Sequence, residues 1–221
     1  MTDIAGNLRR ILERIEGAAK RAGRPPNSVR LLAVTKTVSP EHIREAIQCG
    51  VMHIAENRLQ EALPKREALA SENLIWHFIG HLQTNKAKKV VENFDCVHSV
   101  DRVELAEALA RQVSSRSPLP VLIEVKLQEE QNKSGVSEAD LPVLVSSVQA
   151  LKTLELRGLM VIPPPVEDPE QARPFFRRLR VLAEDLGLPE LSMGMTHDFD
   201  VAVEEGATMV RIGTGLFGSR S

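Results

Sequence analysis

Short runs of apolar and β-branched residues alternate with segments of helical periodicity along the whole chain. Runs such as VLIEV and LRGLMVI are almost continuously apolar, which is typical of parallel strands covered by helices. The pattern predicts eight strands, at Leu31–Thr35, Met52–Ala55, Trp76–Ile79, Cys96–Ser99, Val121–Lys126, Leu156–Ile162, Glu190–Met193 and Met209–Ile212. Eight strand–helix units favour an α/β fold with a single (β/α)8 barrel. A doubly wound open sheet is the alternative, disfavoured because the chain has no nucleotide-type glycine loop.

The first 24 residues carry apolar side chains at helical spacing, interrupted by charged ones. Ile4, Leu8, Ile11, Leu12 and Ile15 mark the apolar side. This spacing predicts an extra amphipathic helix before the first strand, rather than the continuous apolar core of a signal peptide. No apolar run approaches the roughly 20 residues that a membrane-spanning helix needs. We therefore expect a cytoplasmic protein with no membrane partner.

Residue types that begin and end helices separate the predicted strands. Ser39-Pro40 predicts the start of a helix that Gly50 ends, and Asp101 with Glu104 three residues later forms a capping-box pattern. No linker or low-complexity stretch interrupts the chain. We expect one domain over residues 1–221, with no second β-domain.

The composition narrows the class of partner. Of the 221 residues, 43% are hydrophobic and 26% are charged, and the formal net charge is -2. Lys and Arg are scattered along the chain, so we expect no nucleic-acid partner. Cys49 and Cys96 predict buried thiols rather than a disulfide framework. The pattern shows no large exposed apolar stripe, which favours a monomer.

In barrels of this kind, residues at the C-terminal ends of the strands carry the chemistry. Lys36 ends the first predicted strand after an apolar run. Desolvation or nearby cations could remove a proton from such a lysine and let it attack a carbonyl. The alternative is a surface lysine at the start of a loop.

A candidate phosphate site follows the last two predicted strands. Gly213 and Thr214 offer backbone N–H groups and a hydroxyl, and Ser192 at the end of the seventh strand would add another donor. Barrels often bind phosphate between the loops after strands seven and eight. The alternative is a tight turn between strand and helix.

Other polar residues at strand ends could contact the same ligand. Arg211 could pair with a phosphate, a ring nitrogen or a carboxylate of the barrel, and Asn57 could bind a ligand hydroxyl or cap a helix. His81 and Lys133 could line the barrel mouth or serve only local structure. The histidines have no metal-ligand spacing, so no metal is predicted. A lysine opposite a phosphate site leaves two ligands open: pyridoxal 5′-phosphate (PLP), or a phosphosugar held as an imine, as in class I aldolases.

Several motifs resemble those of the pyridoxal phosphate homeostasis family, also called the YggS or PROSC proteins, and most of all its cyanobacterial members. The motifs are AVTK at 33–36, AENRLQE at 55–61, WHFIGHLQTNK at 76–86, NKSG at 132–135, LRGLM at 156–160, LSMGM at 191–195 and MVRIGTGLFG at 209–218. Together they span nearly the whole chain.

The resemblance implies a fold-type III barrel that binds PLP, and it implies a role for each candidate residue. Lys36 would form the imine, Asn57 would lie near the 3-hydroxyl and Arg211 near the pyridine nitrogen. Ser192, Gly213 and Thr214 would hold the phosphate. The implied function is vitamin B6 homeostasis, with indirect effects on amino-acid and keto-acid levels. Apo PLP-dependent enzymes would be the acceptors of PLP. The resemblance implies no catalytic activity.

Three features favour cofactor handling over catalysis. The chain ends soon after the eighth predicted strand, and it has no tyrosine for the two-base mechanism of a racemase. An arginine at the pyridine nitrogen would weaken the ring as an electron sink. The alternative is a small fold-type III enzyme with weak racemase-like activity. Among departures from the family, Thr196 stands in a segment that more usually contains serine, and we expect it to lie outside the phosphate site.

Overall fold

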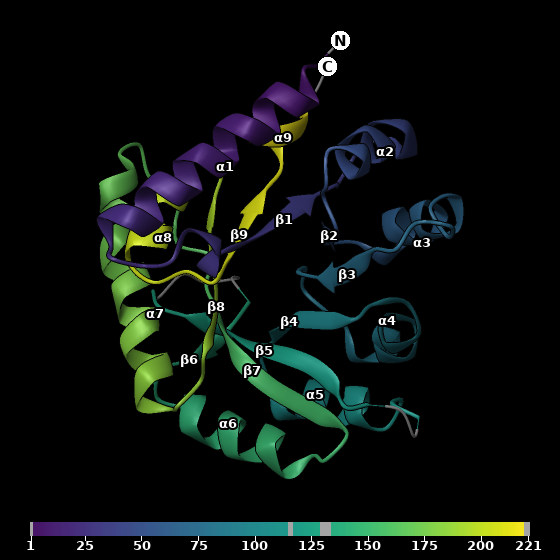
Figure 1. Ribbon diagram of the computed structural model, residues 1–221. Coiled ribbons are helices and arrows are strands. Elements are labelled where there is room, and N and C mark those ends of the chain that lie inside the picture. The colour runs from purple at the N-terminus through teal and green to yellow at the C-terminus, as the bar shows by residue number, and fades with distance from the viewer. Residues whose placement is uncertain (1, 115–116, 129–133, 219–221) are drawn as a thin grey trace.

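Parallel strands close into one barrel (Figure 1). The computed structural model describes residues 2–114, 117–128 and 134–218. The barrel strands are β1 (Arg30–Val34), β2 (His53–Glu56), β3 (Ile75–Phe78), β4 (Cys96–Val100), β5 (Leu119–Lys126), β7 (Leu154–Met160), β8 (Glu190–Met195) and β9 (Met209–Ile212). Each strand pairs in parallel with the next in this order, and β9 pairs with β1 to close the ring. The predicted (β/α)8 barrel is confirmed.

All the predicted strands are present. The reason is that short, continuous apolar runs in an α/β chain usually form buried parallel strands. Their ends differ from the prediction by at most two residues. The difference that matters is at β8, which continues to Met195 instead of ending at Met193. One short strand, β6 (Val136–Ser137), was not predicted; it pairs with β5 outside the ring.

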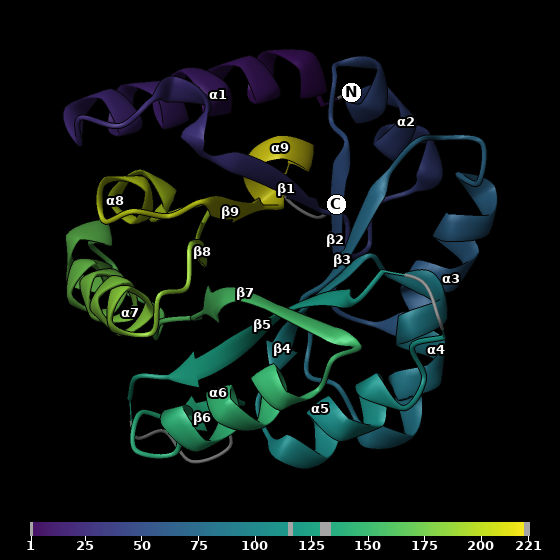
Figure 2. The same cartoon turned by 60° about the horizontal axis from the view of Figure 1, so that its bottom comes forward.

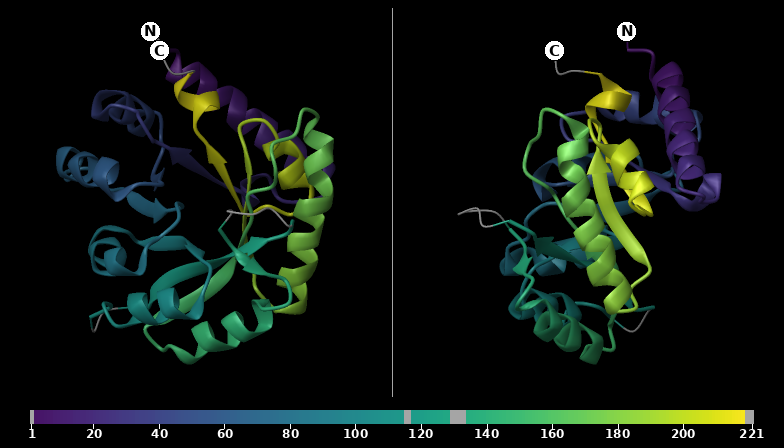
Figure 3. Two further views of the ribbon diagram at one scale, coloured as in Figure 1. Left: turned by 180° about the vertical axis from the view of Figure 1, so that it is seen from behind. Right: turned by 90° about the vertical axis from the view of Figure 1, so that its left-hand side faces the viewer.

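Helices surround the barrel in the described part of the chain, as Figure 2 shows. They are α1 (Ile4–Arg21), α2 (Pro40–Gln48), α3 (Leu59–Ala68), α4 (Ala87–Asn93), α5 (Val103–Ala110), α6 (Leu141–Ala150), α7 (Arg173–Asp185), α8 (Phe199–Glu204) and α9 (Thr214–Phe217), with 3-10 turns at Pro26–Ser28, Thr84–Lys86 and Pro169–Ala172. The predicted extra N-terminal helix is α1, and it runs beside α8 and α9 in both views of Figure 3. Asp3 caps α1 by accepting a hydrogen bond from the Gly6 N–H.

The capping box predicted at Asp101 is not formed. Helix α5 begins at Val103 after Arg102, and no side chain caps its first turn. The Asp101 carboxylate instead pairs with the Arg102 guanidinium and lies 3.7 Å from Nδ1 of His81. The Asp101 side chain therefore makes its contacts at the barrel mouth and does not cap α5.

Apolar side chains form two separate clusters. The larger lies between the strands and the helices, and the smaller fills the inside of the barrel with Leu32, Val34, Ala55, Leu122 and Met160. The two clusters follow from the alternation of side chains along each strand, since Leu32 belongs to one and Ala33 to the other. Within the described ranges, no helix has both the length and the apolarity to cross a membrane.

Candidate functional site

A cavity of about 610 Å³ opens at the C-terminal ends of the barrel strands. Five of the six predicted site residues line it: Lys36, Asn57, Arg211, Gly213 and Thr214. They come from β1, β2 and β9, which are neighbours in the ring. Ile162, Pro163, Pro164 and Phe175 supply apolar wall on the side of β7. The cavity therefore combines several polar groups with an apolar wall suited to a flat ring.

The backbone before Lys36 is held by a buried polar cluster. The Lys65 ammonium on α3 donates to the Thr35 carbonyl at 2.6 Å and to Oε1 of Glu56 at 2.7 Å. The Thr35 hydroxyl donates to the same Glu56 oxygen at 2.6 Å. Glu56 and Thr35 are fully buried, so these charge-assisted bonds act without competition from water. The end of β1 is thereby fixed.

The backbone after Lys36 is equally constrained. Thr37 has φ +63°, a left-handed conformation that β-branched residues rarely adopt. Its N–H donates to Oε2 of Glu61 at 3.1 Å. The turn redirects the chain directly after Lys36, whose own side chain is exposed and lines the cavity. The exposed amine of Lys36 thus extends from a rigid backbone. A side chain that must reach a ligand carbonyl needs such a support.

Asn57 presents an unsatisfied acceptor beside the cavity. Its Oδ1 is buried and has no hydrogen-bond partner among the described residues. Gly80 at the end of β3 lets the chains come this close, because a Cβ there would lie 2.1 Å from the Asn57 carbonyl oxygen. An unpaired buried acceptor costs roughly 1–3 kcal/mol. A ligand hydroxyl donating to Oδ1 would remove that cost.

The loop after β9 forms an anion cradle. Gly213 is the N-cap of α9 and Thr214 is its first residue, and their backbone N–H groups donate no hydrogen bond to any described residue. The Thr214 hydroxyl lies 3.4 Å from the Thr196 hydroxyl, which also accepts from the Gly215 N–H at 3.2 Å. Residues that line the cavity thus carry two amide N–H groups and one hydroxyl hydrogen, that of Thr196, which are not donated to any described residue. This is the donor set that an oxyanion such as phosphate prefers.

Thr196 lines the cavity, although the sequence did not predict it there. It lies beside Thr214, whereas we expected it outside the phosphate site. Ser192 shows the opposite: it is fully buried and is not part of the cavity wall. The cause is the length of β8, which continues for three residues beyond Ser192 and so carries the mouth of the barrel to Met195 and Thr196.

Arg211 forms the floor of the cavity together with Ser192 beneath it. One guanidinium nitrogen donates to the Ser192 carbonyl at 2.6 Å and to its hydroxyl at 2.8 Å, and the other donates to the Val161 carbonyl at 2.8 Å. Burial lowers the pKa of Arg211 to about 10, against the opposing charges of Glu124 and Asp198. The group therefore stays a cation at neutral pH, bonded only to neutral acceptors in the described part of the chain.

Further polar groups of the wall belong to β5 and to the loop after β3. Burial, and secondarily Asp101, raise the pKa of Glu124 to about 7, while Arg211 lowers it. Lys126 ends β5 and also faces the cavity. His81 lies at the mouth, where its Nδ1 is 2.9 Å from the Ser134 hydroxyl. Lys133, which the sequence also suggested for this mouth, lies outside the described residues.

Comparison with known proteins identifies the family. Residues 6–221 match the family described as "Alanine racemase, N-terminal domain". The "Pyridoxal phosphate homeostasis protein" of Aquifex aeolicus is 49% identical over 96% of this chain and 96% of its own length. That of Pseudomonas aeruginosa is 47% identical over 100% of this chain and 97% of its own. The structure of PipY from Synechococcus elongatus with PLP bound superimposes with a TM-score of 0.85 at 41% identity, covering 98% of this chain and 100% of PipY. The chain belongs to the alanine racemase N-terminal domain family and, within it, to the pyridoxal phosphate homeostasis proteins.

Proposed function

We propose that the cavity binds PLP and that the protein serves PLP homeostasis. The observation that carries this proposal is the order of the functional side chains around the barrel. The phosphate cradle follows β9, Lys36 follows β1 and Asn57 follows β2, and these strands are consecutive neighbours. On the PLP ring the aldehyde stands between the phosphate arm and the 3-hydroxyl, with the ring nitrogen opposite. The order of side chains is therefore the order of substituents.

This order also assigns the amine. When bound, PLP supplies an aldehyde that condenses with a primary amine to an imine, and we assign that amine to Lys36. Lys126 faces the same cavity, but it ends β5, which is separated from β9 by β7 and β8. A lysine there does not stand between the phosphate cradle and Asn57.

The other residues bind and orient the ligand in this proposal. Gly213, Thr214 and Thr196 hold the phosphate, with Thr196 taking the place first predicted for Ser192. Asn57 accepts from the 3-hydroxyl through its unpaired Oδ1. Arg211, a buried cation at the floor, faces the ring nitrogen and keeps it unprotonated. Each of these roles uses a hydrogen-bonding group that has unused capacity in the protein.

We also propose that the protein holds and releases PLP rather than catalysing with it. An unprotonated ring nitrogen is a poor electron sink, so Arg211 at that position disfavours carbanion chemistry. Lys36 is exposed, so an incoming amine can reach the bond that it would form. The named relatives are homeostasis proteins, which supports the same role. Large exposed apolar side chains are spread over α1, α6 and several strand ends and form no single patch, which supports a monomer. We also assign the protein to the cytoplasm.

The test of this function is a transfer experiment. The PLP-loaded protein is mixed with an apo PLP-dependent enzyme, and free PLP is kept low with a scavenger that cannot reach bound cofactor. Recovery of the enzyme's activity is expected, and a Lys36→Ala variant loaded under the same conditions should transfer much less. An acceptor that stays inactive would contradict a carrier role. Robust turnover of an amino acid by the wild-type protein, lost in Lys36→Ala, would make it an enzyme instead.

A further inference from the structure

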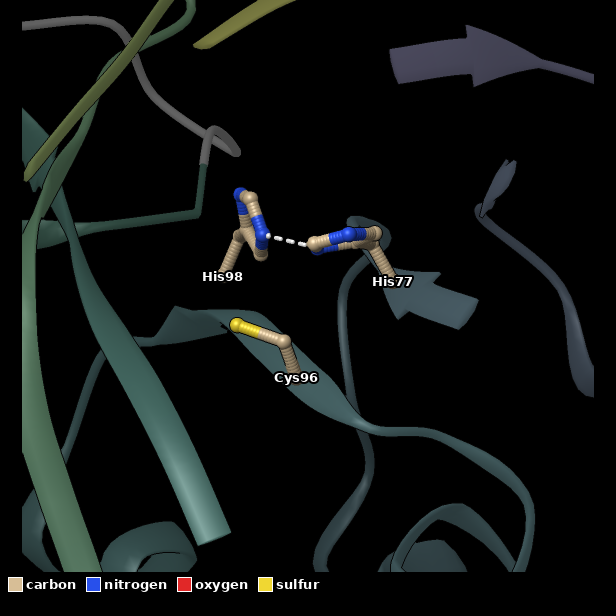
Figure 4. A group of neighbouring side chains, drawn as sticks. All are labelled: His77, Cys96 and His98. Carbon is tan, nitrogen blue, oxygen red and sulfur yellow. Dashed lines mark hydrogen bonds between the residues drawn. The ribbon is translucent and has the colours of Figure 1, made fainter. Parts of the chain in front are cut away.

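A chain of hydrogen bonds crosses the barrel interior beneath the cavity. The Ser192 hydroxyl lies 2.9 Å from Nδ1 of His98 on β4. Nε2 of His98 lies 2.9 Å from Nδ1 of His77 on β3. Figure 4 marks this hydrogen bond with a dashed line. Nε2 of His77 lies 3.0 Å from Nδ1 of His53, the first residue of β2. The chain therefore runs from Arg211 at the cavity floor to the opposite end of the barrel.

The inner histidines of this chain are neutral. Burial lowers the pKa of His77 to about 3, with smaller contributions from the charges of His53 and Arg30. Burial also lowers the pKa of His98 far below its ordinary value, and His77 and Arg211 act in the same direction. Each of these rings consequently carries one N–H and one free lone pair, so each can donate one hydrogen bond and accept one.

Arg211 decides which way the bonds run. A guanidinium can only donate, so the Ser192 hydroxyl oxygen accepts from Arg211. His98 is the other hydrogen-bond partner of that oxygen in the described ranges, so the hydroxyl hydrogen is directed to Nδ1 of His98. His98 must then donate from Nε2 to His77, and His77 from Nε2 to His53. A single tautomer, protonated at Nε2, satisfies every member.

This direction has an electrostatic consequence. Every dipole in the chain turns its negative end toward Arg211, whereas the reverse direction would turn every positive end toward it. In a low-dielectric interior, aligned hydrogen bonds polarise one another and interact strongly with a nearby charge. No carboxylate forms a hydrogen bond or ion pair with Arg211 in the described part of the chain, so the chain compensates a buried cation that lacks a bonded counter-ion.

We propose that Ser192, His98, His77 and His53 are positioning residues that hold the Arg211 cation in place at the cavity floor through a directed line of hydrogen bonds. The arrangement itself concerns the ligand-free protein. Its consequence for PLP, a fixed arginine facing the ring nitrogen, rests on the proposed function. Ser192 thus contributes to the site from below the floor and not as a phosphate ligand.

A metal site is the competing interpretation of the same residues. His77, Cys96 and His98 offer ligand atoms that all lie within 4.8 Å of one another (Figure 4). However, the nitrogens by which His77 and His98 face each other are joined in a hydrogen bond. Burial also raises the pKa of the Cys96 thiol, which opposes the thiolate that a metal needs. The observed positions of His77 and His98 therefore fit a chain of hydrogen bonds better than a metal site.

The direct test is the tautomer of each histidine in the ligand-free wild-type protein. Nitrogen NMR of 15N-histidine-labelled protein at neutral pH distinguishes N–H from bare nitrogen in each ring. We expect His53, His77 and His98 all to carry the proton on Nε2. A proton on Nδ1 of His77 or His98, a charged imidazolium at either, or one tightly bound zinc ion per chain would overturn the proposal. Because no ligand is present, this result is independent of whether PLP binds.

A second measurement tests the consequence for the ligand. His98→Leu removes both hydrogen bonds of the His98 ring, so it interrupts the chain next to Ser192 and should weaken PLP binding about tenfold. The ratio of the affinities for PLP and pyridoxal should stay unchanged, because no residue of the phosphate cradle is hydrogen-bonded to the side chain of His98 or Arg211 in the described part of the chain. His42→Leu on the exposed face of α2 is the matched control and should leave both affinities unchanged. Unchanged PLP affinity in His98→Leu, or a change in the ratio, would contradict a role through Arg211.

Discussion

Replacing Glu124 by glutamine should remove one pH-dependent contribution to the stability of the ligand-free protein. Glu124 lies in the cavity wall, where burial raises its pKa from an ordinary value of 4.5 to about 7. The folded state therefore keeps a proton that the unfolded chain has released. The stability from this proton is complete below pH 4.5 and is lost as the pH rises to about 7.

The size of the effect follows from the pKa values. At 1.36 kcal/mol for each pKa unit, a rise from 4.5 to about 7 corresponds to about 3 kcal/mol. Glutamine has nearly the same shape and cannot ionise, so the variant lacks this loss. The free energy of unfolding of the variant, relative to the wild type, should therefore increase by about 3 kcal/mol between pH 4.5 and pH 8.

Urea unfolding of both proteins at a series of pH values measures this difference. Contributions from titrating groups that do not interact with Glu124 cancel when the two curves are subtracted. Glu13→Gln, on the exposed side of α1, is the control for a Glu-to-Gln substitution away from the cavity wall. A flat difference for Glu124→Gln would mean that the carboxyl is solvated and that the cavity wall is not as dry as its burial indicates.

Two further substitutions test the geometry of the site. Gly80→Ala places a Cβ 2.1 Å from the Asn57 carbonyl oxygen and should lower the free energy of unfolding by about 1–3 kcal/mol in thermal or urea unfolding. Gly17→Ala in α1 is the control, because its Cβ would meet its nearest atom only at 3.5 Å. It should raise the free energy of unfolding by up to about 1 kcal/mol. Equal effects of the two substitutions would refute the close approach of Gly80 to Asn57. Thr196→Val should weaken PLP binding about tenfold and leave pyridoxal binding unchanged, as measured by absorption titration. Equal losses for both ligands would remove Thr196 from the phosphate cradle.

The barrel could be predicted because its strands are local signals. Continuous apolar runs such as those of β5 and β7 identify parallel strands without reference to the rest of the chain. The two-residue β6 is too short to carry such a signal, since its pairing with β5 depends on the tertiary fold. The capping pattern at Asp101 failed for a related reason: a carboxylate near Arg102 and His81 has partners that the sequence does not show.

The site was predictable to the extent that strand ends were. The ends of β1, β2 and β9 were closely placed, and the residues predicted there meet at one cavity: Lys36, Asn57, Gly213 and Thr214 after the strands, and Arg211 within β9. Ser192 is buried and Thr196 lines the cavity instead, because β8 is two residues longer than its apolar run suggests.

The histidine chain could not have been found in the same way. Its members come from β2, β3, β4 and β8, and they meet only when the ring closes. No spacing along the sequence marks them as partners.

Borohydride trapping locates the amine that holds PLP. The purified protein is loaded with one equivalent of PLP and reduced with sodium borohydride, which converts an imine into a stable secondary amine. Peptide mapping by mass spectrometry then locates the pyridoxyl group. We expect it on Lys36, which stands between the phosphate cradle and Asn57, and we expect Lys36→Ala to abolish the label. A label mainly on Lys126, which faces the same cavity from β5, or on Lys133 would contradict the assignment of Lys36.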